Sequence, residues 1–225
     1  MSNKKLIALG IIGALLVGVG DYLLGYVEPT VIENSSLLKI GHGADYNLYL
    51  PIVSMLVASV GMIFYVPMFL GISNTITSSK LKKAFLVTSA CGFFGWLMIH
   101  YYVSSLVYQY AWGVQNGVNN AFEYTTAVLD AFSPIISSWY CIVIIPFIIH
   151  FFATITGKTS LPKATTLANP LLCLLYIAII LSVLPESKFA SALQMGIASE
   201  AILIWIITLL SSYHRKDVCT PLKGF

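Results

Sequence analysis

Three ionisable residues lie inside long apolar stretches of the sequence: Asp21, His100 and Glu200. An ionised side chain is costly to place in hydrocarbon unless it is paired or wet, and residues of this kind usually have a function. Carboxylates and an imidazole can exchange protons, which suits general acid–base catalysis. The same groups can also hold a cation or relay a proton. If the three stretches pack side by side, we expect an acid–imidazole–acid cluster that lines a cavity.

The composition places these residues in a membrane protein. The chain has 225 residues, of which 58% are hydrophobic and only 9% are charged. A soluble domain carries about 25% charged residues. The composition therefore predicts a single integral membrane domain over residues 1–225. The net charge of +3 comes from basic residues spread over several loops, so nucleic-acid binding is not expected.

The first apolar stretch, residues 6–27, is long enough to cross a bilayer and contains Asp21. Small residues on a membrane helix let another helix approach closely. Four glycines fall on the same half of the helical wheel as Asp21: Gly10, Gly13, Gly18 and Gly25. We therefore expect Asp21 to face protein and not lipid. Three roles are open for Asp21. It is a site residue, a hydrogen-bonding partner that joins helices, or a protonated acid near the outer interface.

The hydropathy pattern predicts an all-α, polytopic bundle of six transmembrane helices. The expected spans are residues 6–27, 48–72, 84–107, 135–155, 164–184 and 189–211. Between the third and fourth spans, residues 108–134 are polar and aromatic, which favours a short interfacial helix or lid on the outer side. The sequence has no internal repeat of the kind found in many transporters.

The lysines and arginines predict the orientation of the six spans. Ten of the twelve lie on the side of the two termini, and only Lys39 and Lys188 lie on the other side. Basic residues in short loops favour the cytoplasmic side. We therefore expect cytoplasmic N- and C-termini in a plasma or inner membrane, and membrane lipids as neighbours. The same orientation makes any cavity around Asp21 and His100 open outward.

Five further residues are candidates for lining such a cavity. Trp96 and Ser104 share the helical face of His100, and Tyr22 and Tyr101 lie near the predicted outer side. Glu123 belongs to the polar stretch that could act as a lid. The tyrosines are either members of an interfacial aromatic belt or part of a ligand cavity.

A metal site is an alternative use of the same residues. His42 and Asp45, in the sequence GHGAD, could join His100 and Asp21, because imidazole and carboxylate ligands suit zinc or another divalent ion. The alternative is that GHGAD forms a glycine-containing turn. The four cysteines form no CxxC pair, so neither a disulfide framework nor a zinc framework is expected. No cofactor can be named.

Two resemblances to known families follow from short motifs. The GDYLLGY run at residues 20–26, in a six-span chain of this length, resembles an uncharacterised bacterial membrane family known only as a domain of unknown function. Gly20-Asp21 followed by leucines, together with His100-Tyr101, is also similar to the lysoplasmalogenase-like membrane hydrolases. That second resemblance implies Asp21 and His100 as site residues of a hydrolase. The chain departs from it in having six expected spans instead of about eight, and in lacking a second Gly-Asp motif.

The sequence as a whole favours a membrane-embedded enzyme that acts on a lipid or an amphipathic small molecule. Asp21 and Glu200 would be acid–base or ligand-holding groups, and His100 would carry protons. A small transporter or ion- or proton-coupled permease is the alternative, using the same residues for coupling. A third class is a non-catalytic binding or assembly protein, in which Asp21 only joins helices.

Overall fold

The computed structural model describes residues 1–27 and 46–218, with side chains through Tyr213. The described residues are helical apart from turns and one isolated bridge between Ile76 and Thr159. The element order is α1 (Asn3–Gly25), α2 (Tyr49–Ile63), α3 (Tyr65–Ser73), α4 (Ser79–Gln115), α5 (Ala121–Ile155), the 3₁₀ helix η2 (Lys163–Ala168), α6 (Pro170–Val183) and α7 (Lys188–Val218).

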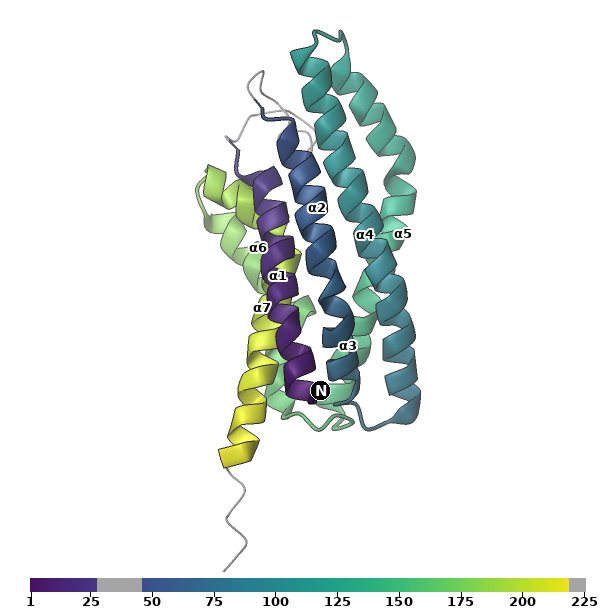
Figure 1. Cartoon of the computed structure of the whole chain (residues 1–225), viewed down its shortest axis with the longest axis vertical. Helices are drawn as coiled ribbons and strands as arrows, with labels where there is room; N and C mark the ends of the chain where they lie inside the picture. The colour runs from purple at the N-terminus through teal and green to yellow at the C-terminus, as the bar shows by residue number, and fades with distance from the viewer. Residues whose placement is uncertain (28–45, 219–225) are drawn as a thin grey trace, which may run out of the picture.

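The helices run up and down along one long axis (Figure 1). The N-terminus and the end of α7 lie at the same end of the bundle, which we call the N-terminal end. The turn between α4 and α5 lies at the opposite end, which we call the hairpin end (Figure 1). Within the described ranges, five spans are long and apolar enough to cross a membrane, with α2 and α3 together forming one of them. This architecture is that of an integral membrane protein.

The first helix packs against α2, α3 and α7, and glycines permit its closest approaches. A Cβ atom added to Gly13 would lie 2.8 Å from the carbonyl oxygen of Gly61, and one added to Gly61 would lie 2.9 Å from that of Gly13. The two backbones therefore touch where α1 crosses α2. The glycine-rich half of α1 does face protein, and Asp21, on the same half, is only 7% exposed.

The second predicted span, residues 48–72, is interrupted at Phe64. The structure has one helix from Tyr49 to Ile63 and a second from Tyr65 to Ser73. Pro67 is the third residue of α3, where it has no N–H to donate to the preceding turn. The sequence therefore restarts a helix at this position instead of continuing the first one.

The predicted interfacial helix in residues 108–134 is not confirmed. The stretch instead belongs to the ends of α4 and α5, which have 37 and 35 residues. At a rise of about 1.5 Å per residue they are about 55 and 52 Å long, well beyond a hydrocarbon core of about 30 Å. A turn with positive φ at Gly117 and Asn120 joins them. Tyr110 and Ala121 pack together beside this turn, which explains why the helices continue through a polar sequence.

The fifth predicted span, residues 164–184, is also not confirmed as a full helix. The helix α6 has 14 residues and begins at Pro170, after the short η2. It is therefore about 21 Å long, shorter than the hydrocarbon core. Asn169 caps it, because its Oδ1 accepts from the backbone N–H of Leu171 at 3.1 Å. Proline at the first position has the right φ to begin a helix and cannot continue one.

Candidate functional site

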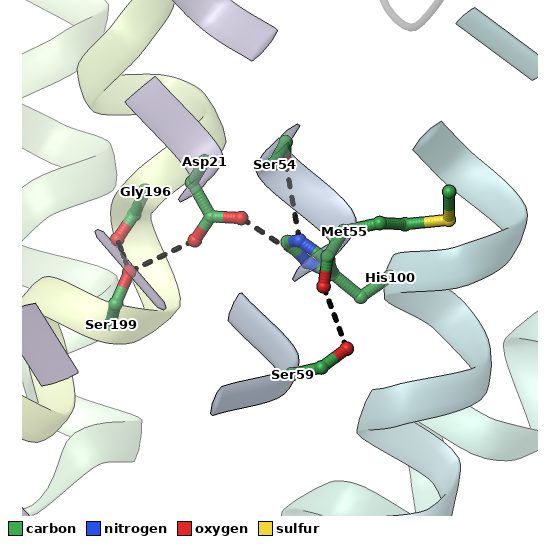
Figure 2. A network of polar contacts seen from close by, with 7 residues as sticks. All are labelled: Asp21, Ser54, Met55, Ser59, His100, Gly196 and Ser199. Atoms are coloured by element: carbon green, nitrogen blue, oxygen red, sulfur yellow. Dashed lines mark hydrogen bonds and ion pairs between the residues drawn. The ribbon is translucent and has the colours of Figure 1, made fainter. Parts of the chain in front are cut away.

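The structure brings Asp21 of α1 and His100 of α4 together. His100 Nδ1 lies 3.4 Å from Asp21 Oδ1, and each residue is 7% exposed. The separation fits an ion pair and is slightly longer than an ordinary N–H···O hydrogen bond. Figure 2 shows the two side chains pointing toward each other between α1, α2, α4 and α7.

Two serines complete this network (Figure 2). The Ser199 hydroxyl of α7 donates to Asp21 Oδ2 at 3.0 Å, and it also lies 2.9 Å from the carbonyl oxygen of Gly196. Ser54 Oγ of α2 lies 3.4 Å from His100 Nε2. Four helices therefore each contribute one side chain to a buried polar chain in the order Ser54, His100, Asp21 and Ser199.

A glycine beside Asp21 allows this arrangement. A Cβ atom on Gly20 would lie 3.0 Å from the carbonyl oxygen of Ser54 and 3.1 Å from the Cβ of Ala58. The backbones of α1 and α2 can approach this closely only because the side chain is missing. The close approach places Ser54 and Asp21 at the same level along the bundle axis, so that the His100 side chain can contact both.

Asp21 and His100 line a cavity of about 370 Å³ that is bounded by α1, α4, α5, α6 and α7. Its other polar lining residues are Tyr140, Ser191 and Gln194. The remaining walls are mainly apolar and come from Leu24, Val27, Trp96, Ile99, Val103, Val143, Ile144, Phe147, Pro170, Leu174, Met195, Ile197, Ala198, Ala201 and Ile202. Ligand sites generally have this character, with apolar walls and a few polar groups that fix orientation.

The α5 wall of the cavity packs extensively on α4 and makes few contacts with α6. α5 is described throughout its length, and none of its residues from 126 to 145 is buried. Tyr140 and Val143 belong to this segment and line the cavity. Below it, the Asn169 side-chain amide donates to the carbonyl oxygen of Phe147 at 3.2 Å. This contact fixes α5 to the start of α6, where Phe147 and Pro170 line the cavity together.

Glu200 takes part in a different contact. Its carboxylate accepts a hydrogen bond from the Tyr22 hydroxyl, which joins α7 to α1. Gly196 makes room for the tyrosine, since a Cβ atom there would lie 2.6 Å from Cε1 of the Tyr22 ring. Neither Tyr22 nor Glu200 lines the cavity. Of the three predicted cluster residues, two are thus in contact and the third belongs to a separate pair.

The other predicted lining residues are distributed as follows. Trp96 lines the cavity. Ser104 is fully buried, and its hydroxyl has no hydrogen-bonding partner among the described residues. Tyr101 is 42% exposed and accepts from Ser59 Oγ at 3.2 Å, and Glu123 is exposed in the first turn of α5. None of these last three residues lines the cavity.

The predicted metal ligands His42 and Asp45 lie outside the described residues. Across residues 1–27 and 46–218, no group of three His, Cys, Asp or Glu side chains is arranged to hold a metal ion. Asp21 and His100 would supply two ligands of such a site.

Sequence reasoning missed several polar residues of the site. Ser54, Ser199, Tyr140 and Gln194 carry no motif, and hydroxyl residues are common in membrane helices because they can bond their own backbone. Ser199 directly precedes Glu200, but only the packing of α7 on α1 shows that the serine, and not the acid, contacts Asp21.

Comparison with known proteins places the chain in a family without assigning an activity. No curated protein and no solved structure matches it. The similarity to lysoplasmalogenase-like hydrolases is therefore neither supported nor refuted. Residues 1–216 match a family of unknown function designated DUF6796, which agrees with the resemblance of the GDYLLGY run, and the chain belongs to this family.

Proposed function

We propose that this protein is a membrane-embedded enzyme that performs general-base chemistry on an amphipathic molecule, with Asp21 as the proton acceptor. The observation that carries the proposal is that the Asp21 carboxylate lies in the wall of a largely apolar cavity of about 370 Å³ and keeps unused acceptor capacity. An apolar cavity with one reactive polar position suits a molecule with a hydrocarbon tail and a polar end.

The distribution of hydrogen bonds favours Asp21 over His100 as the base. A carboxylate offers about four lone-pair positions, and Asp21 uses one with His100 and one with Ser199. An imidazole has two nitrogens, and those of His100 are directed at Asp21 and Ser54. In this proposal His100 and Ser199 are positioning residues, and Asp21 is the group that touches substrate.

Hydrolysis of an acyl ester is the reaction that fits these groups best. Asp21 accepts a proton from water as the water oxygen bonds to the ester carbonyl carbon. The intermediate then collapses, the bond to the alcohol oxygen breaks, and that oxygen receives the proton from Asp21. Tyr140 lines the same cavity as Asp21, so its hydroxyl is the candidate donor to the carbonyl oxygen.

Ser54 resembles the nucleophile of a Ser–His–Asp triad in its order of contacts. Its side chain is nevertheless fully buried, and it does not line the cavity. A bound substrate would therefore meet Asp21 and not the Ser54 hydroxyl. We assign Ser54 the role of holding the His100 ring, which orients Nδ1 toward Asp21.

Lipid turnover tests the proposal. Purified protein in vesicles that contain a diacyl phospholipid, a lysophospholipid and a monoacylglycerol is incubated, and the lipids are quantified by mass spectrometry. We expect the wild type to consume one of the two single-chain esters, the lysophospholipid or the monoacylglycerol. In Asp21→Asn this consumption should fall at least a hundredfold, while the circular dichroism spectrum stays unchanged. No consumption by the wild type, or equal consumption by the variant, would contradict the proposal.

Transport is the second candidate, and the sparse contact between α5 and α6 on one side of the cavity favours it. α5 contains Pro134 and Pro146, and no residue between 126 and 145 is buried in this fully described helix. A wall with few contacts on one side can move more readily than one that is packed on both sides. Flux of a solute across the vesicle membrane without chemical change, lost in Asp21→Asn, would support transport over catalysis.

We infer a plasma or inner membrane location with both termini in the cytoplasm. The N-terminus lies at the same end of the bundle as the end of α7 (Figure 1), and Lys80, Lys83 and Lys158 lie in or beside the turns that the sequence places on that side. Labelling of single cysteines in intact cells tests this, in a chain whose native cysteines are replaced by alanine. Asn116→Cys should react with a membrane-impermeant maleimide, and Ser2→Cys should react only after lysis. The reverse pattern would overturn the orientation.

A further inference from the structure

The charge of the cavity wall restricts the polar end of any occupant. Asp21 is the one acidic residue that lines the cavity, and no lysine or arginine does so in the part of the chain that the structure describes. His100 is the one basic side chain of the described wall, and its two nitrogens already face Asp21 and Ser54. A phosphate or carboxylate group bound here would therefore face Asp21 without a free cation to balance it. Like charges at close range in a site with little water disfavour binding strongly. The wall therefore selects against anionic polar ends.

Hydrogen bonding restricts the polar end further. Asp21 has acceptor positions that neither His100 nor Ser199 uses. The two nitrogens of His100 are directed at Asp21 and at Ser54. At this depth the cavity thus mainly offers acceptor oxygens, and the group that complements them is a hydrogen-bond donor.

The length and the volume of the cavity restrict the size of the hydrocarbon tail. The lining residues of α7 run from Ser191 to Ile202, which is about 16 Å along the helix at about 1.5 Å per residue. The polar residues Ser191 and Gln194 lie at the start of α7, toward the hairpin end, and the apolar residues Phe147 and Pro170 line another part of the wall. A volume of about 370 Å³ is at the small end for ligand sites, which suits one hydrocarbon chain.

We propose that the cavity binds a single-chain amphipath whose polar end donates hydrogen bonds and carries no negative charge, with an ammonium group preferred over a hydroxyl. Of the acceptor positions of Asp21 that His100 and Ser199 leave free, one accepts from this polar end and another stays available to the water of the proposed hydrolysis. The hydrocarbon chain lies against the apolar wall. The proposal rests on the proposed function, because it names the substrate class of the same cavity. It predicts that phospholipids and fatty acids with an anionic end are poor occupants.

Binding of matched twelve-carbon probes tests this preference. The full chain in phosphatidylcholine nanodiscs is titrated with dodecylamine, dodecanol and dodecyl phosphate, and the fluorescence of Trp96 in the cavity wall reports occupancy. A Trp96→Phe variant identifies the part of the signal that comes from membrane partitioning. We expect dodecylamine to bind most tightly and dodecyl phosphate least tightly. Asp21→Asn should weaken dodecylamine binding by roughly tenfold to hundredfold.

A charge introduced at the rim keeps the proposal testable even if Asp21→Asn does not fold. Gln194 is exposed and lines the cavity, whereas Ser211 is exposed on the same helix and does not line it. Gln194→Lys should weaken dodecylamine and strengthen dodecyl phosphate, and the control Ser211→Lys should leave both unchanged. The proposal is overturned if dodecyl phosphate binds the wild type as tightly as dodecylamine, or if both lysine variants behave alike.

The outcomes also separate this proposal from the proposed function. Selective dodecylamine binding without turnover of any ester would leave the ligand class standing and remove the enzyme. Asp21-dependent turnover of an anionic single-chain ester would leave the enzyme standing and remove the ligand class.

Discussion

His100 Nδ1 lies 3.4 Å from Asp21 Oδ1 and links α4 to α1. The helix α2 packs against both of them. The His100 side chain also contacts Ser54 of α2. If either member of the pair is removed, the other is left buried without its main partner, which costs about 1–3 kcal/mol. The pair therefore contributes to the fold as well as to the candidate site.

This arrangement predicts different effects for two substitutions of His100. His100→Leu should lower the free energy of unfolding by about 1–3 kcal/mol, because Asp21 and Ser54 both lose a polar neighbour. His100→Gln keeps an amide that can bond one of them, so we expect a smaller loss. Unfolding in detergent, followed by circular dichroism, measures both. Equal stability of the two variants would show that the polar contacts of His100 contribute little.

The glycines of α1 give a second prediction with a matched control. Gly13→Ala places a methyl group 2.8 Å from the carbonyl oxygen of Gly61, whereas Gly18→Ala places one 3.6 Å from Ser199 Oγ. Overpacking typically costs about 1–3 kcal/mol, and alanine in an open helical position gains up to about 1 kcal/mol over glycine. We expect Gly13→Ala to be destabilised and Gly18→Ala to be unchanged or more stable in the same detergent assay. A result in which Gly13→Ala is as stable as Gly18→Ala contradicts the close crossing of α1 and α2.

Asn169 gives a third prediction, because it both caps α6 and bonds to α5. Asn169→Ala loses a helix cap, worth about 1 kcal/mol, and a buried hydrogen bond of similar value. We expect a loss of about 1–3 kcal/mol in stability and weaker dodecylamine binding, since the part of the cavity wall at Phe147 loosens. Asn116→Ala is the control, because among the described residues the Asn116 side chain bonds only the Trp112 carbonyl oxygen of its own helix, at an exposed position. If the two variants lose the same stability and binding, Asn169 does not fix this part of the cavity wall.

The Tyr22–Glu200 pair gives a fourth prediction. Because neither residue lines the cavity, Tyr22→Phe should lower stability by about 0.5–1.5 kcal/mol and leave dodecylamine binding within twofold of the wild type. Glu200→Gln should behave in the same way. A double-mutant cycle in unfolding measures the coupling between them. A tenfold loss of dodecylamine binding in either variant would place the pair in the site.

The parts of the fold that follow from composition and periodicity could be predicted from sequence. The low charge content predicts a membrane protein, and the glycines that share a half-wheel with Asp21 correctly predict that this residue faces protein. Of the two residues expected on the face of His100, Trp96 lines the same cavity as His100 and Ser104 does not. These signals are local, because each depends on residues within a few turns of one helix.

The features that the sequence does not reveal depend on contacts between distant segments. Hydropathy treats residues 164–184 as one span and does not detect the helix cap at Asn169. The side-chain amide of Asn169 also donates to the carbonyl oxygen of Phe147, 22 positions earlier in the chain. Hydropathy also does not identify Tyr22 as the partner of Glu200. The Tyr22 ring reaches Glu200 because Gly196 on α7 has no side chain to block it. The polar residues between 108 and 134 favour an interfacial helix in the sequence, because the sequence does not show the contact between Tyr110 and Ala121 that joins the ends of α4 and α5.

Chemical modification of the two membrane carboxylates tests the central claim most directly. Dicyclohexylcarbodiimide, an apolar reagent, forms adducts with carboxyl groups that it can reach from the membrane, and mass spectrometry of the digested protein locates them. The reagent attacks the fraction of a carboxyl group that carries a proton, and a primary amine would couple to the activated carboxyl, so dodecylguanidinium is used as the cationic donor in place of dodecylamine. Our account predicts that the reagent modifies Asp21, that dodecylguanidinium prevents the modification of Asp21, and that dodecyl phosphate does not. Neither ligand should change the extent to which Glu200 is modified. An Asp21 that is unreactive, or that is modified to the same extent with and without dodecylguanidinium, would contradict the account.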